Sequence, residues 1–179
     1  MVGIELFSEP EVDELLRVFR DVSKIPPAEV LSYLIELSEA VLGLYILMRD
    51  SLPKDYGRIK FSRFVEKKRK QVEGIRSIMM EMYPGARIRG HDISLKFDVE
   101  TVQDYSKVLE DAIQLESLSL RVLRHLVESS DNKILLNDIA QDIEDNIREL
   151  QRELDRLRKF ESKARFSEFV KELVGDRDG

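Results

Sequence analysis

The chain has 179 residues, 42% apolar and 36% charged, as expected for a soluble globular domain with a small appendage. It contains no cysteine and only two histidines, which excludes disulfides, iron–sulfur clusters and cysteine nucleophiles and argues against an imidazole-rich metal site. The net charge of −6 argues against general nucleic-acid binding.

The first half of the chain predicts three helices. Residues 1–25 begin with several acids instead of a signal peptide, and Ser8 to Glu11 has the pattern of a capping box for a short amphipathic helix. Two prolines separate it from a helix over about 28–51, which is apolar nearly all round and is therefore expected at the centre of a bundle. Its apolar run, Tyr33–Met48, contains two glutamates and is expected to be too short and too acidic to span a membrane. A further helix covers about 59–83.

The second half repeats this pattern after a non-helical stretch over 85–98. Asp98 is expected to cap a helix over about 99–129, and another helix continues to about 162 with a strict apolar seam. We therefore predict an N-terminal helix in 1–25, a four-helix bundle in 26–162 made of hairpins 28–83 and 99–162, and a short helix with a polar tail in 163–179.

The two predicted hairpins resemble each other. A shift of 78 residues superimposes the apolar positions of the first long helix on those of the third, and a shift of 75 does the same for the second and fourth. Heptad patterns can align by chance, but the nearly equal shifts favour two similar hairpins related by a pseudo-twofold axis.

Two charged residues interrupt the apolar stripes. Glu116 has Leu109, Ala112, Leu120 and Leu123 as neighbours at helical spacing, and a buried carboxylate must be paired, protonated or bound to a metal. Lys68 lies on the apolar seam of the second long helix. We predict an internal ion pair between Glu116 and Lys68. In the alternative, both residues lie at the edge of the core and extend into solvent.

The paired hairpins, with the segments Ala112–Glu116 and Leu34–Glu39, resemble the ferritin-like, rubrerythrin-related four-helix bundles over residues 28–160. This resemblance implies two irons in the bundle core, held by one Glu from each of two helices and by a Glu-x-x-His pair from each of the others. The corresponding positions are Ser38, Lys68, Gln71, Glu116, Ile143 and Asn146. Only Glu116 matches a family ligand, although further carboxylates lie nearby at Glu36, Glu39, Glu66 and Glu144.

The favoured interpretation is an all-α, ferritin-like antiparallel four-helix bundle with short extra helices at both termini. We expect it to have lost its di-metal site and to act as a structural or interaction protein, without catalysis or a cofactor. We also expect a cytoplasmic homodimer with an unidentified protein partner and no contact with membrane or nucleic acid.

Two alternatives remain open from the sequence. The first is a di-iron or di-manganese carboxylate oxidoreductase, or an iron-binding protein, with ligands among Glu116, Glu39, Glu36, Glu66 and Glu144. The second is a helical module that binds an anionic partner. It arises because residues 54–76 contain nine Lys or Arg against three acids, and its candidate residues are Arg58, Lys60, Arg63, Lys67 and Lys70.

Overall fold

The protein is all-helical in the part of the chain that the computed structural model describes, which comprises residues 27–53, 55–86, 98–129, 131–161 and 163–175. The helices are α2 (Pro27–Ser51), α3 (Tyr56–Met82), α4 (Val102–Ser129), α5 (Lys133–Leu157) and α6 (Phe166–Gly175). These ranges contain no strand, only an isolated bridge between Thr101 and Arg165. The predicted helix within 1–25 lies outside the described residues.

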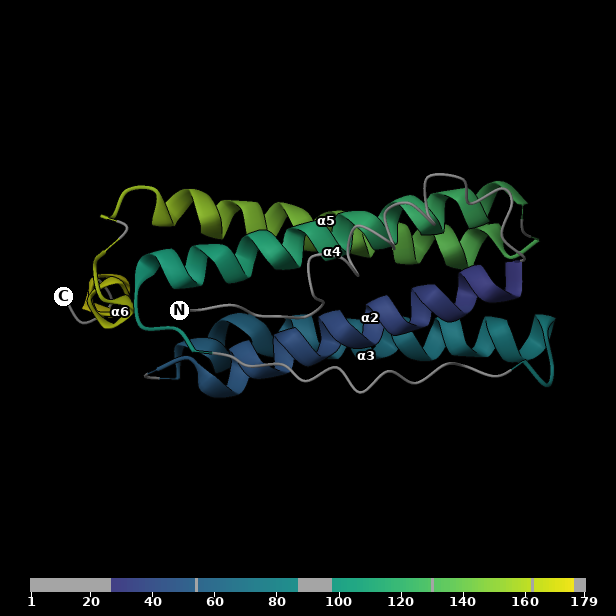
Figure 1. Cartoon of the computed structure of the whole chain (residues 1–179), viewed down its shortest axis with the longest axis horizontal. Helices are drawn as coiled ribbons and strands as arrows, with labels where there is room; N and C mark the ends of the chain where they lie inside the picture. Colours follow the sequence, from purple (N-terminus) through teal and green to yellow (C-terminus); the bar gives the residue numbers. More distant parts are fainter. Residues whose placement is uncertain (1–26, 54, 87–97, 130, 162, 176–179) are drawn as a thin grey trace.

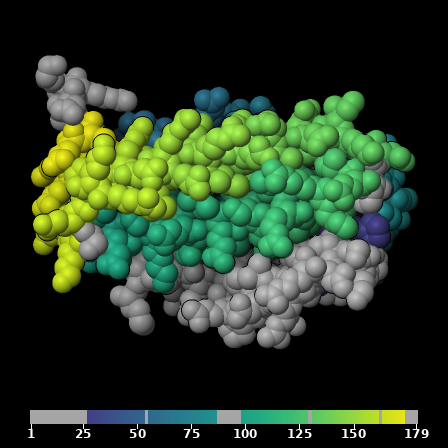
Figure 2. Space-filling view, turned by 90° about the horizontal axis from the view of Figure 1, so that it is seen from above, coloured from purple at the N-terminus to yellow at the C-terminus, as the bar shows by residue number. Residues whose placement is uncertain are grey.

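The four long helices form two hairpins that lie along each other (Figure 1). Short connections join α2 to α3 and α4 to α5, and the main contact between the hairpins is made by α2 against α4, with a smaller one between α3 and α5. Figure 2 shows α4 and α5 side by side across one face, with α6 at their end.

The connection from α3 to α4 joins opposite ends of this arrangement. Helix α3 ends at the end of the molecule remote from α6, whereas α4 begins beside α6 (Figure 1). Because α3 ends at one end of the molecule and α4 begins at the other, α3 and α4 run in the same direction, and each runs antiparallel to its partner within its own hairpin.

Helix α2 has the buried position that its apolar pattern predicts. Between Val30 and Met48 every residue is buried or half-buried. The expectation that its apolar run is too short and too acidic to span a membrane was wrong in one respect. By length and composition alone, α2 is long enough and apolar enough to cross a membrane. The core helix of a globular protein can have the same length and composition, and 61% of the most apolar window of α2 is buried inside the protein.

Helix α4 begins three residues later than predicted, and Asp98 does not cap it. Instead, the Thr101 amide donates to Asp104 Oδ2 at 2.9 Å, while the Asp104 amide donates to Thr101 Oγ1 at 3.1 Å. This reciprocal capping box satisfies two backbone donors at the helix start. The Thr-x-x-Asp spacing that produces it is visible in the sequence.

Helix α6 closes one end of the molecule through backbone and aromatic contacts. The Val102 amide donates to Ala164 O and the Phe166 amide donates to Glu100 O, each at 2.9 Å. Phe166 packs edge-on against Tyr105, with ring centroids 4.7 Å apart. These contacts attach the C-terminal helix to the start of α4.

Helices α2 and α3 approach very closely at Gly57, near the start of α3. A Cβ atom on this residue would lie 2.1 Å from the carbonyl oxygen of Met48 and 2.6 Å from that of Arg49. Only glycine fits here without moving one helix backbone away from the other.

Candidate functional site

Charged side chains form two clusters in the interior of the described structure. The buried polar residues are Ser32, Ser38, Lys68, Gln71, Glu116, Ser119, Asn146 and Glu153. One group contains Glu116 with Lys68, Gln71 and Asn146, and we call it the central cluster. The other surrounds Glu153, and we call it the end cluster. Asn146 of the central cluster and Glu153 are about 10 Å apart along α5.

The central cluster is an ion pair between two helices. The Lys68 ammonium on α3 lies 2.5 Å from Glu116 Oε1 on α4, and neither side chain is exposed. Lys68 Nζ also donates to Gln71 Oε1 at 2.7 Å, and Asn146 Nδ2 on α5 donates to Glu116 Oε2 at 3.4 Å. Each charge therefore has its counter-charge and at least one neutral hydrogen-bond partner.

Tyr45 on α2 lies next to this ion pair. Burial, followed by the negative charge of Glu116, raises the pKa of the Tyr45 hydroxyl well above its usual value, so the phenol stays neutral. Its Oη makes no hydrogen bond of standard geometry within the described part of the chain, so the influence of Glu116 is mainly electrostatic. Ser38 Oγ and Gln71 Nε2 are buried and unpartnered there as well.

The central cluster coincides with the positions to which the resemblance assigns ligands. All of these positions, Ser38, Lys68, Gln71, Glu116, Ile143 and Asn146, are buried. Four of them form the chain of contacts described above. The structure brings Lys68 and Glu116 together as expected and excludes the alternative in which both extend into solvent.

The other carboxylates named as possible metal ligands do not converge on Glu116. Glu39 pairs with Arg76, and Glu66 is 71% exposed with Lys70 3.5 Å away. Glu36 is half-buried on α2. Across the described ranges, no three His, Cys, Asp or Glu side chains are placed to hold a metal ion. The residues around Glu116 therefore do not fit a two-metal centre, since a lysine and two amides occupy the ligand positions.

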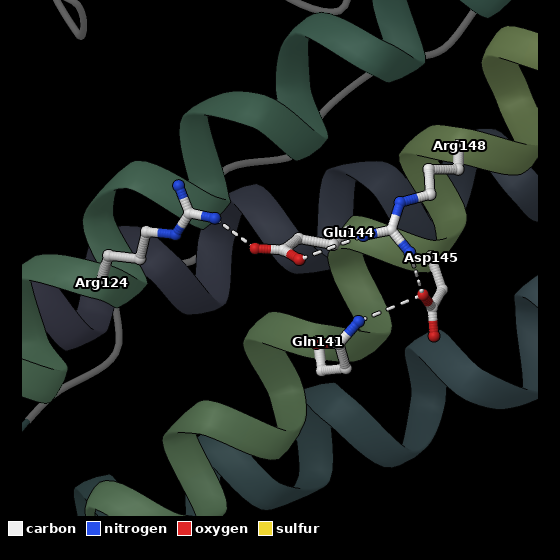
Figure 3. A network of polar contacts seen from close by, with 5 residues as sticks. All are labelled: Arg124, Gln141, Glu144, Asp145 and Arg148. Atoms are coloured by element: carbon white, nitrogen blue, oxygen red, sulfur yellow. Dashed lines mark hydrogen bonds and ion pairs between the residues drawn. The ribbon is translucent and has the colours of Figure 1, made fainter.

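Glu144 belongs instead to a surface network between α4 and α5 (Figure 3). Its carboxylate pairs with Arg124 of α4 and lies 3.6 Å from Arg148 Nη2, four residues further along α5. Arg148 also contacts Asp145, which accepts a hydrogen bond from Gln141. Exposed pairs of this kind contribute little to stability individually.

The end cluster was not predicted from the sequence. Glu153 is 1% exposed and lies 3.0 Å from Lys60 Nζ, while Tyr105 Oη donates to it at 3.3 Å and Tyr56 Oη donates to it as well. Burial and the charge of Glu153 raise the pKa of both tyrosines above the usual value. The sequence contains one indication that Glu153 is buried, because this residue lies three residues after Leu150 and four before Leu157, on the apolar seam.

The expected anion-binding patch loses a member to this cluster. Lys60 extends inward to Glu153 and is only 25% exposed. Arg58 lies 3.9 Å from Asp55, Lys70 lies beside Glu66, Arg63 is exposed and Lys67 is half-buried. The outer face of α3 is thus basic but partly neutralised by its own acids.

Comparison with known proteins gives a fold and no function. No protein-family model and no curated protein matches the chain. A solved structure of a hypothetical protein from Pyrococcus furiosus is similar, with a TM-score of 0.71 and 18% identity over 80% of this chain and 97% of that one. At this identity the likeness shows only that the two chains share a helical architecture.

Proposed function

We propose that this chain is a ferritin-like antiparallel four-helix bundle that has lost its di-metal site and acts as a structural or interaction protein. The observation that carries the proposal is the buried ion pair between Lys68 and Glu116. It lies where the resemblance assigns metal ligands. The two hairpins and the long connection between α3 and α4 support the fold assignment, since ferritin-like bundles have one such connection.

The chemistry of the central cluster favours a structural role. An ammonium beside a carboxylate supplies the positive charge that a metal would otherwise supply, and the amides of Gln71 and Asn146 complete the contacts. Both charged side chains are fully buried, so no substrate reaches them in this state. Such a pair couples α3, α4 and α5 and disfavours alternative packing of the helices.

The same proposal includes the setting in which the protein works. We expect a cytoplasmic homodimer that binds a further protein, since an inert bundle would act through its surface. Light scattering of the purified protein measures the mass of the assembly directly, and a monomer at micromolar concentration would remove the dimer from the proposal.

Metal content tests the proposal. Protein purified without chelator would be loaded with ferrous iron or manganese, desalted and analysed for metals, alongside Glu116→Ala and the exposed control Glu66→Ala. We expect no stoichiometric metal in any of the three. About two equivalents of metal in the wild type and in Glu66→Ala, lost in Glu116→Ala, would contradict the proposal and favour a di-metal oxidoreductase or iron-binding protein.

A further inference from the structure

We infer that the central cluster is a binding site for a primary ammonium ion, and that the Lys68 side chain is its covalently tethered ligand. The inference rests on the proposed function in that it concerns the same buried pair. It goes further because it names the chemical class that the site selects when the tether is removed.

The contacts of Lys68 Nζ are those of a bound ammonium ion. The nitrogen lies 2.5 Å from Glu116 Oε1 and 2.7 Å from Gln71 Oε1, so two oxygens from different helices face it. An ammonium group has three N–H donors. Tyr45 Oη is a buried hydroxyl without a hydrogen-bond partner of standard geometry in the described structure, and Tyr45 lies next to Glu116.

The charge of the cluster selects a monovalent cation. Among the described residues Glu116 is its only buried carboxylate. Glu149, whose charge also raises the pKa of Tyr45, is half-buried, and Gln71, Asn146 and Tyr45 are neutral. Without the ammonium the cluster would carry a single negative charge in a buried environment, which a monovalent ion balances. Hard divalent ions are generally held by several carboxylates, and no such group exists within the described ranges.

The surroundings of the Lys68 stem suit a short alkyl chain. Val65, Val72 and Ile75, its neighbours at helical spacing on α3, are all buried. Replacement by alanine removes the three outer methylenes and the ammonium, which together have the size of propylammonium. Cavities lined by apolar side chains bind small molecules of matching size even when they are closed to bulk solvent.

The first experiment measures the rescue of Lys68→Ala by propylammonium chloride. We expect this variant to unfold at lower temperature than the wild type. Propylammonium should raise its Tm roughly with the logarithm of its concentration above Kd, by about 5 °C or more at a hundredfold excess. Sodium chloride at equal ionic strength and 1-propanol should give no such increase. The wild type and the exposed control Lys70→Ala should not respond.

The carboxylate is tested in the same background. Adding Glu116→Gln to Lys68→Ala should abolish the rescue, because the counter-charge is gone. An equal effect of 1-propanol would show a merely apolar cavity and overturn the inference. A larger increase from MnCl2 than from propylammonium would identify a metal site, and would also overturn it.

A second variant serves if Lys68→Ala does not fold. The chain has no cysteine, so Lys68→Cys introduces a single thiol. Under denaturing conditions its thiolate displaces bromide from 2-bromoethylamine, which forms a C–S bond and rebuilds a lysine-like ammonium; 1-bromopropane gives the neutral counterpart. After refolding, we expect only the aminoethylated protein to approach wild-type stability. Equal stability of the two products would overturn the inference, whereas metal in the wild type would contradict only the proposed function.

Discussion

At the scale of single residues, the pairing of Lys68 with Glu116 makes each charge depend on the other. Lys68→Met leaves the carboxylate buried without a counter-charge, and we expect a loss of about 3–5 kcal/mol in the free energy of unfolding. The double variant Lys68→Met with Glu116→Leu should recover much of this loss, because no charge remains unpaired. Urea unfolding measures all of these values.

The matched control is Lys70→Met, since Lys70 lies on the same helix but is 75% exposed. We expect its unfolding curve to match that of the wild type. A Lys68→Met variant as stable as the wild type would show that the buried pair does not hold the helices together.

The buried tyrosines make stability depend on alkaline pH. The pKa values of Tyr45, Tyr56 and Tyr105 are raised in the folded state by burial and by a neighbouring carboxylate. Above pH 10, the usual tyrosine value, the unfolded chain loses these protons first, so stability should fall progressively as the pH rises further. Unfolding at a series of pH values measures the slope, and Tyr105→Phe should reduce it. An unchanged free energy of unfolding from pH 9 to 11.5 would contradict this.

The residue scale also shows what a sequence can predict about a site. Lys68 and Glu116 each interrupt an otherwise apolar stripe, so burial and mutual pairing could be predicted from spacing alone. The end cluster could not be predicted in this way. Lys60 lies in a basic segment, and only the packing of α3 against α5 shows that its side chain turns inward to Glu153.

At the scale of helices, two glycines of α3 differ in whether the space around them can accept a Cβ atom. Gly57→Ala places a Cβ against the carbonyl oxygens of Met48 and Arg49, so α2 and α3 must separate. We expect a loss of about 1–3 kcal/mol, the usual cost of overpacking. Gly74→Ala meets only Ile139 Cδ1, at 3.7 Å, and should stabilise the helix by about 0.5–1 kcal/mol. Thermal and urea unfolding of the two variants compare them directly, and a Gly57→Ala protein as stable as Gly74→Ala would contradict this view of the α2–α3 contact.

Helix positions could be predicted because apolar periodicity and proline breaks are local signals. Helix starts were less accurate, as the start of α4 shows. Asp98 has the right chemistry for a cap. However, Thr101 and Asp104 accept hydrogen bonds from each other's backbone amides in a capping box, which satisfies two donors where a single capping side chain would satisfy one.

At the scale of the whole molecule, the all-helical class and the two hairpins follow from long periodic segments and short connections. The direction of α4 relative to α3 does not follow, because it depends on how the two hairpins pack, with α2 buried between α3 and α4. Local sequence signals do not encode such a choice between parallel and antiparallel neighbours.

The backbone bridge between the start of α4 and the segment before α6 has a consequence for how the protein opens. The amides of Val102 and Phe166 stand at helix starts, where amides usually bond to water, yet each donates to a carbonyl more than sixty residues away in the chain. These two hydrogen bonds therefore join the start of α4 to the segment that follows α5, at the open end of the α4–α5 hairpin. Fraying, which ordinarily begins at such ends, has to start here with the release of α6, so the C-terminal helix sets the threshold for local unfolding of the second half of the molecule.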